Sequence, residues 1–283
     1  MVWNSIRGAF ILAVNELKTL LRSTKLIVIF IFAIFINIQI VMPLQELSKM
    51  MGTKISFLET FIAMGNAPVV ALIIPLFFLI IISDYPREGA VQYFFHIRMN
   101  RKTWIMAQMI YGIMVSLLVV LAALLISIVL SVGISKIDLK YSEATTHFLK
   151  EYPEKNSEYV ATLITQRLYN QRPLVSVFWH SIGLSFLNYM LMSFIILFTS
   201  VMGKKIVGIV LNILLIVVGY VFSGLSTGSK WILPMTHTLT GTHFNDISRK
   251  PVFPMGGSYI YFGALILLLG ILIFLFRKKI RAV

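Results

Sequence analysis

The chain of 283 residues contains no cysteine, and charged residues make up only 13% of it. The missing thiols exclude disulfide bonds, thiolate metal sites and cysteine nucleophiles. The charge is mostly of one sign, because 25 Lys and Arg residues against 11 Asp and Glu residues give a formal net charge of +14. Hydrophobic residues make up 58% of the chain, so it has no soluble region large enough for a separate catalytic domain.

Six long apolar stretches contain no Asp, Glu, Lys or Arg. Each is close to or above the roughly 17 to 25 residues that a helix needs to cross about 30 Å of hydrocarbon. The sequence therefore predicts an all-α integral membrane protein with one transmembrane domain, residues 1–283, and six transmembrane helices. The predicted spans are Leu26–Met42, Ala67–Ser83, Thr103–Gly133, Val175–Met202, Ile206–Phe222 and Tyr259–Phe276.

The basic residues between the spans predict the orientation. One set of segments holds 14 basic and 3 acidic residues, whereas the other holds 11 basic and 8 acidic residues over about twice the length. The first set comprises residues 1–25, 84–102, 203–205 and 277–283, and the second comprises residues 43–66, 134–174 and 223–258. By the positive-inside rule, the first set and both termini face the cytoplasm. The net charge then indicates topology and attraction to membrane lipids rather than nucleic-acid binding.

Residues 1–25 have the periodicity of an amphipathic helix with a largely basic polar face. Such a helix lies in the membrane interface or packs on the bundle, and Ser23–Lys25 forms a bend into the first span. Its apolar positions are Trp3, Ile6, Phe10, Ala13, Val14, Leu17, Leu20 and Leu21, and its polar positions include Asn15, Glu16, Lys18 and Arg22.

Residues 84–102 form the short cytoplasmic segment between spans two and three. Pro86 suits the first turn of a helix, and large apolar side chains follow it. A solvated loop rarely carries so many, so they pack on the ends of the spans or bind a cytosolic partner. These side chains are Val91, Phe94, Phe95 and Ile97, with Ala90 beside them.

This segment resembles that of the membrane subunits of type-2 ATP-binding-cassette exporters. The resemblance rests on Glu88-Gly89-Ala90 after span two and on Arg98-Met-Asn-Arg101-Lys102 before span three. Ala90 stands where the family more often has Thr, and the family's Pro-x-Ser turn is absent. The N-terminal amphipathic helix, the short Gly203–Lys205 turn and the Pro-containing segment before span six extend the resemblance over essentially the whole chain.

The resemblance implies an elbow helix at residues 1–25 and a coupling helix that seats in a groove of an ATPase subunit. It implies two cytosolic ATPase subunits, which bind ATP and Mg²⁺, and a second copy of this chain or a related permease. No cofactor is expected in this chain. The implied ATPase-coupling residues are Arg87, Glu88, Gly89, Val91, Phe94, Phe95 and Arg98.

The outward segments predict short helices. In residues 223–258, the apolar run Trp231–Met235 is too short to span and contains Pro234, which favours re-entrant or interfacial helices. His237 and His243 are not expected to form a metal site, because few acidic residues lie near them. In residues 134–174, a helix is expected from Asn156 or Ser157 to about Tyr169, and it could serve in gating, substrate release, partner binding or as a structural cap.

The spans lack ionisable groups apart from His180 and Tyr hydroxyls, which disfavours transport driven by protons or sodium. No acid–base constellation for an intramembrane enzyme can be assembled. Gly203-Lys204 lacks the spacing of a Walker A loop. The chain is therefore not expected to be an enzyme, and energy for transport would enter from a separate subunit.

Four amides in the spans are candidates either for hydrogen bonds between helices or for the substrate path: Asn37, Gln39, Asn188 and Asn212. Asn37 and Gln39 lie in span one, which lines the subunit interface and translocation path in the resembling family. Pro75 is expected to kink span two and to mark a hinge.

The sequence thus favours the transmembrane subunit of an ATP-driven efflux transporter in a bacterial cytoplasmic membrane. The apolar walls suit a hydrophobic or amphipathic cargo, such as an antimicrobial or other peptide, a lipid-linked molecule or a drug. The alternative is a stand-alone channel or immunity-type membrane protein without an ATPase, and a membrane enzyme dependent on His180 ranks third. Homodimer and heterodimer both remain open.

Overall fold

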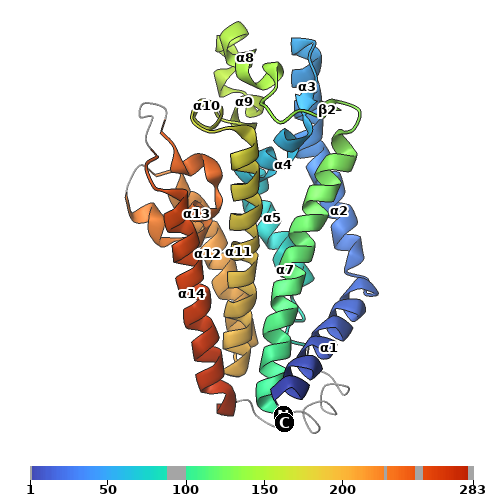
Figure 1. Cartoon of the computed structure of the whole chain (residues 1–283). Helices are drawn as coiled ribbons and strands as arrows, with labels where there is room; N and C mark the ends of the chain where they lie inside the picture. The colour runs from blue at the N-terminus through green and yellow to red at the C-terminus, as the bar shows by residue number, and fades with distance from the viewer. Residues whose placement is uncertain (1, 88–99, 226–227, 246–250, 280–283) are drawn as a thin grey trace.

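The computed structural model describes residues 2–87, 100–225, 228–245 and 251–279, and they form an elongated bundle of helices (Figure 1). Five helices are long and apolar enough to cross a membrane, and a bent pair of helices supplies a sixth candidate. The protein is therefore a predominantly helical, multi-pass membrane protein. The five are Leu26–Met51, α7 (Arg101–Ser131), α11 (Leu174–Val201), α12 (Lys205–Ser223) and α14 (Met255–Leu275).

The second helix of the bent pair, α5 (Pro68–Ile81), corresponds to the predicted span Ala67–Ser83. It has 14 residues and rises only about 21 Å. It follows α4 (Phe57–Asn66) at an angle of 83°. The span is thus broken, and α4 comes from the segment expected to be an outward connection.

The first span differs from the expected Leu26–Met42, because its helix continues through Pro43 to Met51. It consists of α2 (Leu26–Ile36), a π-helical segment η1 (Asn37–Val41) and α3 (Met42–Met51). Pro43 has no N–H to give to the carbonyl of Gln39. The wider turn, in which the Met42 N–H bonds to the Asn37 carbonyl five residues back, accommodates this missing bond.

The N-terminal helix α1 (Val2–Leu21) precedes a bend at residues 22–25 and packs on α7 (Figure 1). Its buried face contains Ala9, Leu12, Ala13 and Leu20, whereas Ile6, Phe10, Ile11 and Leu21 are exposed. The helix thus has one apolar face that packs on the bundle and, next to this face, a second apolar face that is exposed. This second face suits the interfacial position that the sequence predicts.

Glu16 does not lie on the solvated polar face that the sequence predicts for this helix. Its side chain is buried toward α7, where a carboxylate oxygen accepts a hydrogen bond of 2.7 Å from Gln108 Nε2. The sequence placed Glu16 on the solvated side, because its partner lies 92 residues away along the chain. A buried carboxylate is retained here because it is hydrogen-bonded.

Helix α11 is the most buried of the five long helices and contacts α4, α7, α12 and α14. Its approach to α12 is close at Gly208, where a Cβ atom would lie 2.0 Å from Thr199 Oγ1. Only a residue without a side chain fits between the two helices at this point. The beginning of α1 and the end of α14 lie at one end of the bundle (Figure 1).

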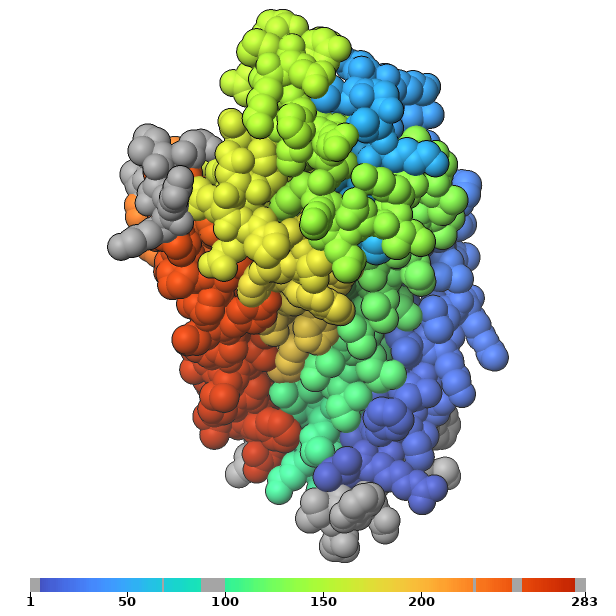
Figure 2. All heavy atoms as spheres, turned by 45° about the horizontal axis from the view of Figure 1, so that its top comes forward, coloured from blue at the N-terminus to red at the C-terminus, as the bar shows by residue number. Residues whose placement is uncertain are grey.

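The other end carries a cap, which lies beside α3 (Figure 2). Strand β1 (Ile55–Ser56) pairs in parallel with β2 (Ser135–Lys136) beneath the cap. The single helix expected up to Tyr169 is instead broken, because Ile164 is extended and buries its side chain. The helices of the cap are α8 (Glu143–Glu151), the 3-10 helix η2 (Pro153–Ser157), α9 (Tyr159–Leu163) and α10 (Gln166–Tyr169).

The segment before the last span forms three short helices among its described residues. They are η3 (Gly228–Ile232), α13 (Pro234–Thr238) and η4 (Thr240–His243). Helix α13 packs on α11, α12 and α14, so this segment is part of the bundle rather than a free loop.

Candidate functional site

The break between α4 and α5 is the most irregular point of the membrane-spanning part. Ala67 is extended, with φ −64° and ψ 128°, as expected for a residue that precedes a proline. Non-helical backbone within a span is tolerated where protein buries it, and broken helices mark substrate sites in transporters. This break is therefore the centre of the candidate site.

The side chain of Asn66 links the end of α4 to the segment before the last span. Its Nδ2 donates to the Ile62 carbonyl at 2.8 Å and to Thr240 Oγ1 at 3.0 Å, and its Oδ1 accepts from the Gly241 N–H at 2.7 Å. A Cβ atom at position 241 would lie 3.0 Å from Asn66 Oδ1, so glycine permits this approach. Asn66 was not among the predicted site residues, although an amide just before Ala-Pro is a signal for a helix end.

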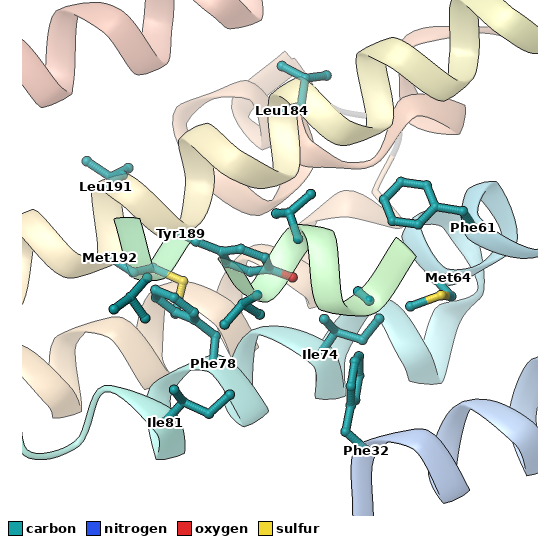
Figure 3. Close-up of a cluster of buried hydrophobic side chains, with 14 of the residues drawn as sticks. Phe32, Phe61, Met64, Ile74, Phe78, Ile81, Leu184, Tyr189, Leu191 and Met192 are labelled. Carbon is teal, nitrogen blue, oxygen red and sulfur yellow. The ribbon is translucent and has the colours of Figure 1, made fainter. Parts of the chain in front are cut away.

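A cavity of about 40 Å³ lies beside the break, between α4, α5, α7, α11 and α13. Phe61 and Met64 of α4, Ile74 of α5 and Tyr189 of α11 line it, and Figure 3 shows these four side chains within a cluster of buried hydrophobic residues. Most of its polar side chains come from α11, namely Ser181, Ser185, Asn188 and Tyr189, and α13 adds Thr238. A water molecule needs roughly 10 to 15 Å³ by this measure, so the cavity admits water and excludes a peptide or lipid.

A second cavity of about 10 Å³ lies on the other side of Asn188 and is also lined by Asn212. Asn212 Nδ2 donates to the carbonyls of Met192 at 3.2 Å and Gly208 at 2.9 Å. Among the described residues, its buried Oδ1 has no hydrogen-bond partner, which suits an ordered water. The two amides thus line the same small cavity between α11, α12 and α13, whose other lining residues are apolar.

The structure therefore brings three predicted residues together: Pro75 and Asn188 line the larger cavity, and Asn188 and Asn212 line the smaller one. Asn37 and Gln39 are half-buried in the π-helical segment and line neither cavity. Helix α5 continues through Pro75, and the large bend of this span lies seven residues earlier, at Pro68.

The residues that follow α5 form a second well-defined feature. Lys25 Nζ contacts the Asp84 carboxylate at 2.9 Å, Ser83 Oγ at 2.7 Å and the Ile81 carbonyl at 3.2 Å. The ammonium group of Lys25 holds the pKa of Asp84 below its ordinary value. This carboxylate therefore stays charged at neutral pH.

The same residues are bound to two more helices. Lys205 Nζ donates to the carbonyls of Asp84 at 2.8 Å and Pro86 at 3.1 Å. Buried Tyr85 donates to the Gln108 carbonyl at 2.8 Å. Residues 84–86, hereafter the junction, are thus held by the start of α2, by α7 and by the start of α12.

The predicted coupling residues follow this junction. Arg87 is half-buried and lines an open groove with Asp84 and Lys205. The other predicted residues, Glu88, Gly89, Val91, Phe94, Phe95 and Arg98, lie outside the described residues.

Two imidazoles are buried in the segment before the last span. His237 Nε2 donates to the Trp231 carbonyl at 2.7 Å, so its Nδ1 accepts from Ser258 Oγ at the same distance. His243 has a carbonyl beside each ring nitrogen, at 3.0 Å and 3.2 Å. Within the described ranges no group of three or more His, Asp and Glu side chains is placed to hold a metal ion.

His180 of α11 hydrogen-bonds to a different partner from these two rings. Its Nδ1 is 3.1 Å from the Tyr259 hydroxyl, in a half-exposed position. This pairing places His180 at the contact between α11 and α14 rather than in either cavity.

Comparisons with known protein families, with curated proteins and with solved structures find no match.

Proposed function

We propose that this chain is the permease subunit of an ATP-driven efflux transporter in the cytoplasmic membrane, as its resemblance to type-2 exporters implies. Two cytosolic ATPase subunits bind ATP and Mg²⁺, and a second copy of the chain or a related permease completes the path. Both termini face the cytoplasm. The cargo is a hydrophobic or amphipathic molecule.

The junction is the observation that carries this proposal. It lies directly before the predicted coupling segment, and its backbone and side chains are bonded to Lys25, Gln108 and Lys205. A partner that displaces the coupling segment would therefore move the starts of α2 and α12 and the adjoining turns of α7 together. A loop without a mechanical role needs no such connection to three spans.

The broken span supports the same function. The cavity beside Ala67 leaves room for α4 and α5 to rearrange, but it is too small to hold the cargo. The path is therefore assigned to the surface between two copies.

Two variants separate binding of the ATPase from transmission of its movement. Phe94→Asp places a charge in the predicted coupling helix, so it should abolish recovery of an ATPase with the tagged protein from native membranes. Lys205→Ala should leave this recovery intact, because it changes only the junction. In the recovered complex, ATP with vanadate should alter hydrogen exchange of α12 in the wild type and not in Lys205→Ala.

The matched control is Lys204→Ala, which removes the neighbouring exposed lysine and should behave as the wild type. Unchanged ATPase recovery with Phe94→Asp, or no ATPase with any version of the chain, would contradict the proposal. Ion conduction by the chain alone in liposomes would instead favour the stand-alone channel.

A further inference from the structure

An open groove of about 530 Å³ lies at the end of the bundle that holds the bend between α1 and α2. It is formed by the end of α1, the residues after α5 and the start of α12. It is lined by six residues with polar or charged side chains: Thr19, Arg22, Ser23, Asp84, Arg87 and Lys205. Neither cavity of the candidate site includes any of these residues.

The groove carries excess positive charge. Its lining holds three cationic side chains, Arg22, Arg87 and Lys205, against one acidic side chain, Asp84, which is also paired with Lys25 outside the lining. In the described part of the chain, the ion pairs found include neither Arg22 nor Arg87. The groove is therefore built to attract an anion.

The hydrogen-bond donors that line the groove indicate which class of anion it binds. Thr19 Oγ1 donates to the Asn15 carbonyl at 2.8 Å, and Ser23 Oγ donates to the Leu20 carbonyl at 2.6 Å. The two guanidinium groups therefore supply the donors. Guanidinium groups form paired, parallel hydrogen bonds with phosphate oxygens, which makes a phosphate group the best fit.

The surroundings of the groove are apolar on the side of the spans. Exposed apolar side chains of α2, α5 and α12 begin directly beside the basic residues, and α5 contacts both of the other helices. They are Ile27 and Phe30 of α2, Ile80 of α5, and Ile206 and Val207 of α12. This change from basic to apolar surface is what a lipid headgroup and its acyl chains meet at a membrane interface.

We propose that this groove binds the phosphate group of an anionic membrane lipid, with the acyl chains lying along α5 beside α2 and α12. The site depends only on this chain and on no ATPase, so it stands or falls separately from the proposed function. An acidic segment of a partner protein would meet the guanidinium groups but would not use the apolar surface.

The test measures lipid binding to the full-length protein in an uncharged detergent by native mass spectrometry. Dioleoylphosphatidylglycerol is titrated, with dioleoylphosphatidylcholine and inorganic phosphate as comparison ligands. One phosphatidylglycerol should bind more tightly than either. Removing both guanidinium groups by Arg22→Gln with Arg87→Gln should weaken its binding roughly 25-fold, at about fivefold for each charge near a membrane surface.

The matched control is Arg7→Gln, an exposed arginine on the same helix and outside the groove. This substitution should change the affinity for phosphatidylglycerol less than about twofold. If the attraction were diffuse, loss of this charge would weaken binding by the same factor of about five. Arg22→Lys with Arg87→Lys should keep most of the binding, and melting temperatures without lipid confirm that each variant folds.

Three results would overturn the proposal. An equal loss in Arg7→Gln would indicate diffuse attraction. Equal binding of inorganic phosphate would indicate a site for the free anion. Unchanged lipid binding in the double variant, together with loss of a recovered protein partner, would assign the groove to that partner.

Discussion

The carboxylate of Glu59 shows how one residue joins two distant parts of this chain. It is fully buried at the first turn of α4 and accepts from the Ser56 N–H at 3.0 Å, the Ser142 N–H at 2.7 Å and Ser142 Oγ at 2.9 Å. Ser142 is also the N-cap of α8. One side chain thus connects the base of the cap to the bundle, in addition to the pairing of β1 with β2.

Glu59→Gln should therefore destabilise this end of the protein. The amide replaces one acceptor oxygen by a donor that faces other donors, at a cost of about 1.5 to 3 kcal/mol. We expect a lower melting temperature and faster hydrogen exchange in α8. Glu143→Gln, in the exposed first turn of α8, is the matched control and should change neither. Equal effects of the two substitutions would contradict the assignment.

The buried imidazoles predict sensitivity to acid. Burial lowers the pKa of both His237 and His243 below the ordinary value of 6.5, and hydrogen bonds to backbone carbonyls only partly oppose this. Below about pH 6.5 the unfolded chain takes up protons that the folded chain does not. Stability should fall from there through the folded pKa values, by at most about 1.4 kcal/mol per pH unit for each ring.

The measurement is the melting temperature between pH 7.5 and pH 5. His243→Gln should reduce the slope below pH 6.5, whereas His147→Gln on the exposed face of α8 should leave it as in the wild type. If the melting temperature falls with the same slope in all three proteins, protonation of the buried rings is not the cause of the acid sensitivity.

At the scale of elements, the contact between α11 and α12 depends on the absence of a side chain. At Gly208 an added Cβ would lie 3.1 Å from the Ile196 Cα as well as close to Thr199 Oγ1, which already donates to two helix carbonyls. At Gly263 of α14, an added Cβ would meet nothing within 4 Å. The two glycines form a matched pair in two spans.

Gly208→Ala should cost about 1 to 3 kcal/mol, because the helices must separate to accept the methyl group. Gly263→Ala should be neutral or stabilising by up to about 1 kcal/mol, since alanine favours the helix. Thermal unfolding in the same detergent compares the two variants. A destabilisation of equal size at both positions would show that packing of α11 on α12 is not the cause.

Some of these elements could be predicted from the sequence, whereas the contacts between them could not. Charge-free apolar runs place five spans within a few residues, because hydrophobic length is a local property. The continuation of the first helix through Pro43 was missed, because Glu46 and Lys49 follow it and indicate a loop. Glu16, Asn66 and Lys205 were missed as structural residues, because each takes its meaning from a partner on another helix. The cavities depend on several helices at once, so no spacing in the sequence indicates them.

At the scale of the whole molecule, α1 and the end of α14 lie opposite the cap (Figure 1). The predicted orientation therefore has a simple test, because the chain has no native cysteine that would be labelled in the background. A thiol introduced at Lys18→Cys on α1 should react with an impermeant maleimide only after the cells are opened. A thiol at Lys150→Cys on α8 should react in intact cells. The reverse pattern would place the basic end outside.

The shortness of α5 affects the membrane around the protein. This helix rises about 21 Å, whereas a bilayer has about 30 Å of hydrocarbon, and its exposed side chains Val69 and Ile80 face lipid between α2 and α12. The adjoining α4 turns away by 83°, so it does not lengthen this surface. A bilayer accommodates such a short span by local thinning, so we expect a thinner bilayer beside α5. A polar headgroup that crosses the membrane beside α5 would therefore pass through a thinner hydrocarbon layer than beside the full-length spans.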